Sequence, residues 1–454
     1  MQIIHSKLCQ LATHCRAIGA TGLILTLFAS VQMAQAAAGD LDPTFGTGGT
    51  LMTDLNRSTD LANAVAIQSD GKLIVVGQTY KNNDYSTEDF AVARYNTDGT
   101  LDTTFGNGGR VRTDFPGLAA VPSSVVIQPD GKIVVAGGAF PLFTFLGDFK
   151  VVRYNSNGSL DRSFGSGGIV TTTFPQGSYA FDVALQTDGK IIAAGTVFVN
   201  FDPGESSDTD FALARYNSDG TPDTTFGNGG QVSTDFVGFE DDAFSVLIQA
   251  DGKIVAVGSA NDPATFYDFA AARYLSNGTI DTTFGVGGKV RTDFGDQNFD
   301  RARSAALQSD GKIVAAGFAI SQNGGVQNFA VARYTSNGIL DTTFSGDGKT
   351  QIDFGNCCQS AMKVLLQSDG KIVTVGGSNG ESSEDDFLLA RLSPRGSLDN
   401  NFGVGGKVRT SFGDLNGGAN GAARQSDGKI VAVGFQATFS NQWSNFALAR
   451  YLTQ

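Results

Sequence analysis

The chain has 454 residues, of which 41% are hydrophobic and 17% charged, and its formal net charge is −13. Glycine is abundant at 59 residues but proline is ordinary at 10, which excludes collagen-like and proline-rich disordered chains. The acidic balance argues against nucleic acid or an anionic membrane as a partner.

Residues 1–36 have the organisation of an export signal. Lys7 and Arg16 are their only charged residues, an apolar run covers 17–31, and the small residues Ala-Gln-Ala stand at 34–36, as signal peptidase requires. The apolar run is short for a membrane-spanning helix. We expect cleavage near Ala36 and a secreted, periplasmic or cell-surface product that does not span the membrane. An uncleaved interfacial anchor is the alternative.

Cleavage of the signal would also remove side chains that catalytic and metal sites commonly use. Both histidines, His5 and His14, lie in the signal, and its loss takes the formal charge from −13 to −15. A chain without histidine cannot form a Ser-His-Asp or Cys-His arrangement or the usual zinc site. Of four cysteines, only the adjacent Cys357 and Cys358 would remain, either as ordinary thiols or as a strained disulfide.

Three motifs recur seven times in a fixed order in the rest of the chain. The pentapeptide Gln-x-Asp-Gly-Lys defines repeats of about 59 residues, and its glycines are Gly71, Gly131, Gly189, Gly252, Gly311, Gly370 and Gly428. The second motif is Phe-Gly-x-Gly-Gly or a close variant, beginning at Phe45, Phe105, Phe164, Phe226, Phe284, Phe344 and Phe402. The third is a segment that ends in Arg-Tyr, or once in Arg-Leu, with the arginines Arg94, Arg153, Arg215, Arg273, Arg333, Arg391 and Arg450.

Each repeat predicts four short strands. In the copy around Gly311, residues 303–308 form the first strand, an Asp-Gly turn follows, and the apolar run 312–316 forms the second, which Gly317 closes. Residues 328–334 form the third, and the fourth follows the Phe-Gly motif, as in 289–294. We therefore expect an all-β chain.

Seven units of four strands predict one seven-bladed β-propeller over residues 37–454. The chain after the signal begins with a fourth-type strand at 50–54 and ends with a third-type strand at 446–451. The last blade should therefore take its outer strand from the N-terminus, which removes exposed sheet edges. An open β-solenoid is the rival architecture.

The motifs Leu-Asp-x-x-Phe-Gly-x-Gly-Gly, Gln-x-Asp-Gly-Lys-Ile-Val and Asp-Phe-Ala-Val-Ala-Arg-Tyr resemble the delta-60 repeat family of bacterial exported proteins. The resemblance covers essentially all of 39–454. Two copies depart from it, at Phe344-Ser345-Gly346-Asp347-Gly348 and at Ser393-Pro394-Arg395-Gly396. The resemblance implies a β-propeller and an exported location, and it implies no reaction.

The repeated residues allow two interpretations. Seven arginines and seven lysines could form an anion site, but we favour structural pairing, in which each Arg meets an acid of a neighbouring blade. The repeated phenylalanines should pack between blades rather than form a stacking platform. No cofactor and no metal-binding residue are assigned, although turns such as 96–102 and 217–223 could hold calcium at a minority of copies.

Most variation in repeat length falls in the connections from strand two to strand three and from strand four to strand one. These connections emerge at the same end of a propeller, and loops on a rigid scaffold concentrate function. The candidate ligand-binding residues are Phe143, Phe145, Phe201, Glu205, Glu240, Asp241, Asp242, Tyr267 and Trp443. Aromatic residues beside acids suit a glycan or an extracellular protein. We therefore expect a non-catalytic binding protein, with a carboxylate-dependent polysaccharide hydrolase or lyase as the alternative.

Overall fold

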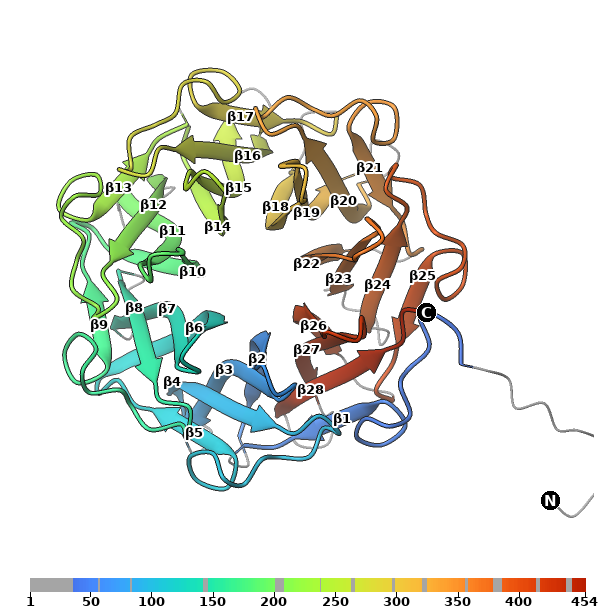
Figure 1. Cartoon of the computed structure of the whole chain (residues 1–454), viewed down its shortest axis with the longest axis horizontal. Coiled ribbons are helices and arrows are strands. Elements are labelled where there is room, and N and C mark those ends of the chain that lie inside the picture. Colours follow the sequence, from blue (N-terminus) through green and yellow to red (C-terminus); the bar gives the residue numbers. More distant parts are fainter. Residues whose placement is uncertain are drawn as a thin grey trace, which may run out of the picture. The chain divides into compact units, whose positions relative to one another are not determined.

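Seven four-stranded sheets are arranged as the blades of a ring in a computed structural model of the chain (Figure 1). The structure describes residues 36–454, apart from 56–57, 82–83, 142–145, 201–207, 237, 263–265, 296–298, 321–324, 356–357, 379–385, 414–416 and 438–442. All regular elements of the described residues are strands, and no helix among them could cross a membrane. The predicted all-β, seven-bladed propeller is confirmed.

The strands fall into four classes by their position in the blade. The innermost strands are β2 (Asp60–Ile67), β6 (Leu118–Ile127), β10 (Ser178–Leu185), β14 (Asp241–Ile248), β18 (Arg301–Leu307), β22 (Gln359–Leu366) and β26 (Gly417–Arg424). The second strands are β3 (Leu73–Lys81), β7 (Ile133–Pro141), β11 (Ile191–Asn200), β15 (Ile254–Asp262), β19 (Ile313–Ile320), β23 (Ile372–Ser378) and β27 (Ile430–Ala437). The third strands are β4 (Asp84–Tyr95), β8 (Asp148–Tyr154), β12 (Asp208–Tyr216), β16 (Phe266–Tyr274), β20 (Gln327–Tyr334), β24 (Phe387–Leu392) and β28 (Ser444–Tyr451). The outer strands are β5 (Arg110–Thr113), β9 (Ile169–Thr172), β13 (Gln231–Thr234), β17 (Lys289–Thr292), β21 (Lys349–Ile352), β25 (Lys407–Thr410) and β1 (Thr50–Thr53).

The ring closes with a strand from each end of the chain. β1 pairs antiparallel with β28, in the register Thr50↔Ala449 to Thr53↔Phe446, and the sheet order is β1-β28-β27-β26. The predicted closure of the last blade by the N-terminal strand is therefore confirmed. Without β1, β28 would be an exposed edge strand of the last blade, to which another chain could add a strand.

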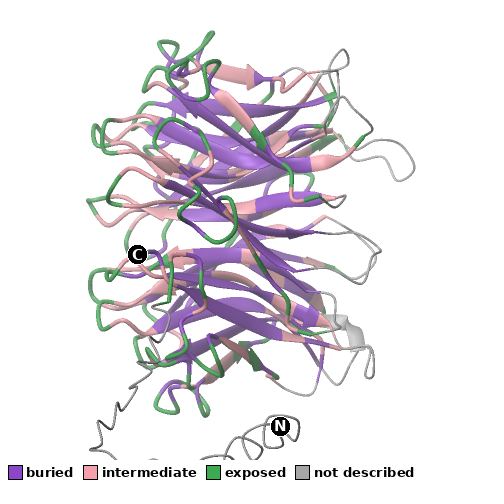
Figure 2. Ribbon diagram, turned by 90° about the vertical axis from the view of Figure 1, so that its right-hand side faces the viewer, coloured by how far each residue is buried: buried purple, intermediate pink, exposed green. Residues whose placement is uncertain are grey.

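Apolar residues pack between successive blades. One core cluster, for example, joins Ile74 and Phe90 of one blade to Ile133 and Tyr154 of the next. Figure 2 shows that buried residues follow the strands and that exposed residues gather in turns at one end. We call this end, where the first-to-second and third-to-fourth turns lie, the regular face, and the opposite end the variable face. The phenylalanines of the Phe-Gly motif are fully buried, in agreement with packing rather than a stacking platform.

A β-bulge interrupts every innermost strand at the same place. In β18, for example, Ala302 pairs with Gly317 and Ser304 with Ala316, so Arg303 has no partner on β19. The sequence interpretation placed Gly317 at the end of the second strand, but it lies within β19, which continues to Ile320. Glycine is required there because a Cβ atom would lie 1.9 Å from the Arg301 carbonyl oxygen.

Replacing a glycine opposite a bulge should destabilise the fold. In Gly258→Ala the new Cβ would lie 1.8 Å from the Asp242 carbonyl oxygen, so the bulge must shift. We expect the free energy of unfolding to fall by about 1–3 kcal/mol, as measured by urea unfolding. Gly418→Ala is the matched control, because its Cβ would meet ordinary contacts of 3.5 Å or more. Equal stability of the two variants would contradict the steric explanation.

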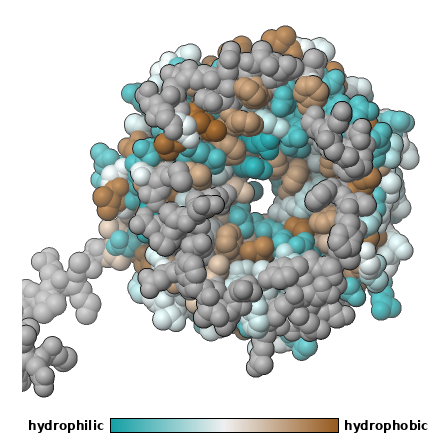
Figure 3. All heavy atoms as spheres, turned by 180° about the vertical axis from the view of Figure 1, so that it is seen from behind, coloured by the Kyte–Doolittle hydropathy of each residue, from teal (hydrophilic) through white to brown (hydrophobic). Residues whose placement is uncertain are grey.

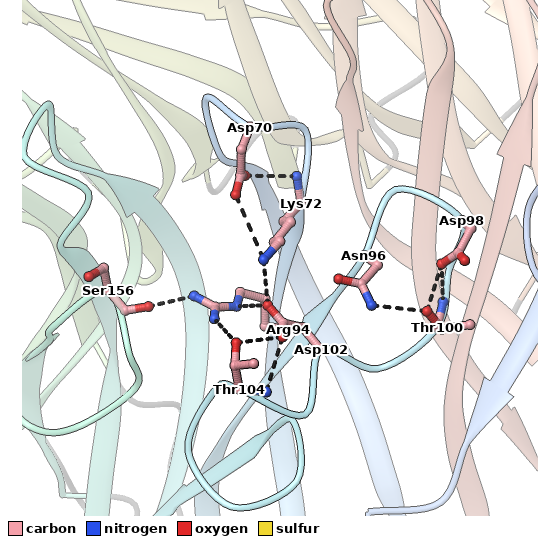
Figure 4. A network of polar contacts seen from close by, with 9 residues as sticks. All are labelled: Asp70, Lys72, Arg94, Asn96, Asp98, Thr100, Asp102, Thr104 and Ser156. Atoms are coloured by element: carbon pink, nitrogen blue, oxygen red, sulfur yellow. Dashed lines mark hydrogen bonds and ion pairs between the residues drawn. The ribbon is translucent and has the colours of Figure 1, made fainter.

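A charged network joins neighbouring blades on the regular face (Figure 4). Arg94 Nε and Lys72 Nζ lie 2.8 and 2.7 Å from the same Asp102 oxygen, and Arg94 Nη1 donates to the Ser156 carbonyl of the next blade. Thr104 donates to the other Asp102 oxygen. The predicted pairing partner was therefore wrong, because each acid comes from the blade of its own Arg and the contact between blades is to a carbonyl. Because the repeated Arg and Lys side chains of this network are paired with carboxylates, they do not form the ring of anion sites that the sequence also allowed.

Candidate functional site

A cavity of about 850 Å³ occupies the centre of the ring. Figure 3, which views the molecule from the variable face, shows the central opening bordered by both hydrophilic and hydrophobic surface. The innermost strands provide most of its lining, because the inner edge of each blade faces the ring axis (Figure 1). A cavity of this size accommodates a small ligand or the end of a polymer.

The seven bulges point one side chain each into this cavity. These residues are Asn63, Ser123, Phe181, Phe244, Arg303, Met362 and Asn420. Each lies five residues before the Gln of the pentapeptide, yet the seven are chemically diverse. The flanking core and turn residues repeat, so the scaffold is nearly symmetric while the cavity lining is not. Bulges are often found where a protein redirects a side chain at a functional site.

The aromatic side chains of the lining form a strip across neighbouring blades. The ring centroids of Tyr179 and Phe181 lie 4.9 Å apart, and those of Phe181 and Phe244 lie 4.7 Å apart. The guanidinium carbon of Arg303 lies 4.4 Å from the Phe244 centroid. The Tyr179 hydroxyl donates to the Val121 carbonyl at 3.0 Å, which fixes one end of the strip.

A second aromatic group lies on the variable face. Phe299 stacks on both Phe266 and Tyr267, with centroid distances of 5.5 and 5.4 Å, and the Arg301 guanidinium covers Tyr267 at 3.7 Å. Phe266 and Phe299 are 50% and 42% exposed. Phe266 also has a φ of 61°, a conformation that is strained for a bulky residue and that clusters at functional sites.

Glu240 connects this group with the cavity. The Tyr267 hydroxyl donates to its carboxylate, and Arg301 Nη2 lies 3.6 Å from the same oxygen. Burial and the Glu240 carboxylate raise the pKa of Tyr267 to about 12, so the phenol stays protonated at neutral pH. Glu240 and Asp242 both line the cavity.

Of the predicted site residues, three come together in the structure. Glu240, Asp242 and Tyr267 come together at the cavity and the adjoining variable face. Asp241 points away, because its carboxylate accepts hydrogen bonds from the Phe236 and Asn261 amides. Trp443 is half-buried and directly precedes β28. The blade of β28 lies on another side of the ring from β14 and β16 (Figure 1). Phe143, Phe145, Phe201 and Glu205 lie outside the described residues, as does Cys357.

Sequence reasoning missed Arg301, Arg303, Phe181, Phe244 and Phe299. It looked for function in the connections, whereas four of these residues lie on innermost strands. The sequence does contain a signal for them. When the seven pentapeptides are aligned, the positions six and three residues before the Gln are mostly Ala and Val, whereas the position five residues before it is among those that vary.

Asp241 belongs to a structural class in which the first residue of an innermost strand caps the preceding connection. Asp60 accepts from the Leu55 amide at 2.7 Å, and Gln359 accepts from the Phe354 amide at 2.9 Å at the equivalent place. Burial raises the pKa of Asp60 to about 6, against the opposing effect of a hydrogen bond from Thr79.

Asp60→Asn should therefore change how stability depends on pH. The unfolded chain releases the Asp60 proton near pH 4 and the folded chain near pH 6, so ionisation favours unfolding as the pH rises between these values. Relative to the wild type, the variant should gain on the order of 1–3 kcal/mol in unfolding free energy between pH 4 and pH 7. Urea unfolding at both pH values measures this. Gln359→Glu is the reciprocal variant, and its unfolding free energy should fall relative to the wild type over the same pH range. If the difference in unfolding free energy between either variant and the wild type does not change with pH, the raised pKa of the capping carboxyl is wrong.

Two clusters of carboxylates could supply oxygen ligands to a divalent cation. Asp210, Asp235 and Asp241 form one, and in each cluster one oxygen per residue lies within 4.8 Å of the others. The second cluster is Asp268, Asp293 and Asp300. The corresponding positions of the other five blades contain at most two acids. Sequence reasoning considered calcium only at turns of the regular face, where Asp98 accepts hydrogen bonds from Thr100.

Several solved structures are similar to this chain at low identity. One is a Staphylococcus aureus virginiamycin B lyase bound to quinupristin, with 11% identity, a TM-score of 0.44 and coverage of 88% of this chain and 98% of that chain. Another is a Penicillium chrysogenum α-L-arabinanase bound to arabinobiose, with 11% identity, a TM-score of 0.44 and coverage of 73% and 93%. A third is Drosophila Plexin A bound to Semaphorin 1b, with 10% identity, a TM-score of 0.40 and coverage of 91% and 88%. No curated protein matches the chain.

A family model described as a β-propeller domain of unknown function (DUF5122) matches six segments, 68–105, 128–164, 186–226, 249–284, 308–344 and 367–402. Each match runs from the Gln of the pentapeptide to the Phe of the Phe-Gly motif. The seventh unit is divided between the two ends of the chain, where ring closure brings its halves together. The narrower delta-60 resemblance stays a prediction. The chain is a β-propeller repeat protein, and six of its seven repeats match the DUF5122 β-propeller family.

Proposed function

We propose that this is an exported, non-catalytic binding protein that holds its ligand in the central cavity and at the adjoining variable face. One observation carries the proposal: the same bulge in all seven blades points a side chain inward, and these side chains differ although the scaffold around them repeats. A residue needed only for the fold would repeat like the paired Arg of the regular face. The side chains of the cavity have instead diverged, as binding an asymmetric ligand requires.

A glycan suits the described residues better than a folded protein. The cavity of about 850 Å³ admits a chain of sugars but not a domain. The exposed rings of Phe266 and Phe299 lie beside Glu240 and Arg301, so stacking surface and hydrogen-bonding groups are adjacent. Aromatic faces pack against the C–H groups of a sugar while charged side chains orient its hydroxyls.

Oligosaccharide binding to the purified chain tests the proposal. Phe244→Ala and Phe299→Ala should each weaken binding at least tenfold while thermal unfolding confirms a folded protein. Val286→Ala is the control, because Val286 is 88% exposed on the regular face. If no glycan binds and an extracellular protein does, with the same dependence on Phe299, the glycan assignment is wrong.

The same panel tests the hydrolase alternative. Glu240 and Asp242 are two residues apart and both line the cavity, so they are the pair that such an enzyme would use. Turnover of a polysaccharide that is lost in Glu240→Gln and in Asp242→Asn would establish an enzyme and overturn the non-catalytic proposal.

A further inference from the structure

Arg303 differs from every repeated arginine of the regular face. It lies at the bulge of β18 and lines the cavity, with its guanidinium over Phe244 at 4.4 Å and 5.9 Å from the Phe318 centroid. Within the described part of the chain, its buried Nε has no hydrogen-bond partner. The Thr196 hydroxyl, which also lines the cavity, interacts with Asp242. By contrast, Arg273 bonds Asp281, Ser336 and Thr283 through its three nitrogens. A buried donor without a partner is costly to a fold unless a ligand completes it.

The charged neighbours of Arg303 do not neutralise it. Burial, followed by the nearby Arg301, lowers the pKa of Arg303 to about 10, so the guanidinium remains protonated at neutral pH. Asp242 is the acid that interacts with Arg303, and burial raises the pKa of its carboxyl. Arg301 is engaged by Glu240 at 3.6 Å. Arg303 itself forms no ion pair with an acid of the described residues, so its guanidinium can pair with a carboxylate from a ligand.

We propose that Arg303 binds the carboxylate of an acidic sugar, such as a uronic acid, whose ring packs on the strip of Tyr179, Phe181 and Phe244. This rests on the function proposed above and specifies its ligand. A planar guanidinium whose face lies on an aromatic ring presents its N–H edge, which matches two carboxylate oxygens. The adjoining rings of Phe181 and Phe244 offer apolar surface to the sugar, and the Thr196 hydroxyl lines the same cavity.

The overall charge limits the size of the ligand. Because the chain has a formal charge of −13, it repels a long polyanion. The acidic sugar should therefore be a single residue at the end of a chain, or part of a short saccharide.

Calorimetric titration of the full chain with glucuronate, galacturonate and a galacturonate trimer tests the inference, with glucose, galactose and the methyl-esterified trimer as neutral counterparts. We expect the acids to bind at least tenfold more tightly than their neutral counterparts. Arg303→Gln should abolish this preference, and Arg303→Lys should retain part of it. Asp242→Asn should strengthen binding of the acids, because it removes a competing carboxylate. Thermal unfolding verifies that each variant is folded.

The outcomes separate the two proposals. If neutral and acidic sugars bind equally and Arg303→Gln changes neither, the binding function stands and the acidic-sugar inference is wrong. If sulfated sugars bind through Arg303 and uronates do not, the carboxylate assignment is wrong. If no saccharide in this panel or in the wider glycan panel binds, both proposals fail.

Discussion

A chain that lacks residues 37–57 should fail to form a stable, soluble propeller. The deletion removes β1, so β28 becomes an open edge, and it removes Asp42, which lies 2.8 Å from Arg450 Nε and 3.0 Å from Lys429 Nζ. It also removes Phe45, which is fully buried against the first and last blades. Loss of a buried acid and of a buried Phe each costs about 3–5 kcal/mol, and the sum is comparable with the whole stability of a typical domain.

A circular permutant is the matched control for this deletion. The Gly39 amide donates to the Leu452 carbonyl at 2.8 Å, so a short linker can join residue 454 to residue 37 and new termini can open at Ser58. The permutant contains every residue that the deletion lacks and should unfold cooperatively, near the temperature of the parent. Size-exclusion chromatography and calorimetry compare the three chains. A deletion variant as monomeric and stable as the parent would show that closure does not hold the ring.

Replacing Arg273 with Met should lower the free energy of unfolding by about 3–5 kcal/mol, because a buried ion pair loses one partner. Arg273 Nε lies 2.8 Å from Asp281 Oδ2, and both side chains are at most 5% exposed. The same guanidinium donates to the Ser336 carbonyl of the next blade at 2.6 Å and covers the Phe284 ring at 4.8 Å. The substitution therefore breaks a contact between blades as well as an ion pair.

Arg395→Met separates this effect from the change in net charge. Arg395 is exposed in a turn of the regular face, so its loss should change stability by less than about 0.5 kcal/mol. Arg273→Lys should recover little, because a lysine cannot contact the acid, the threonine and the carbonyl together. Urea unfolding of the three variants gives the comparison, and equal effects at positions 273 and 395 would contradict the role of the network.

The architecture could be predicted from the repeated motifs alone. The pentapeptide, the Phe-Gly motif and the Arg segment each recur seven times in fixed order, which predicts four strands per unit. Because the strand at one end of the chain is of the fourth type and the strand at the other end is of the third type, the two ends must share a blade and close the ring. This was possible because local signals, such as Asp-Gly turns and apolar runs, act over a few residues and recur seven times. Only the strand ends and the position of Gly317 needed correction.

The ion-pair partners and the candidate site depend on contacts between distant parts of the chain and could not be predicted in the same way. The acid that pairs with each Arg could not be selected from sequence, because several acids stand at suitable distances along the chain and folding brings just one to the guanidinium. The residues of the cavity could not be predicted from the sequence for a related reason. Phe181 and Phe244 are 63 residues apart in sequence and Phe244 and Arg303 are 59 apart, yet the three side chains become neighbours when their innermost strands meet at the ring axis. A bulge, which depends on pairing between strands, then decides which side chain of each strand faces that axis.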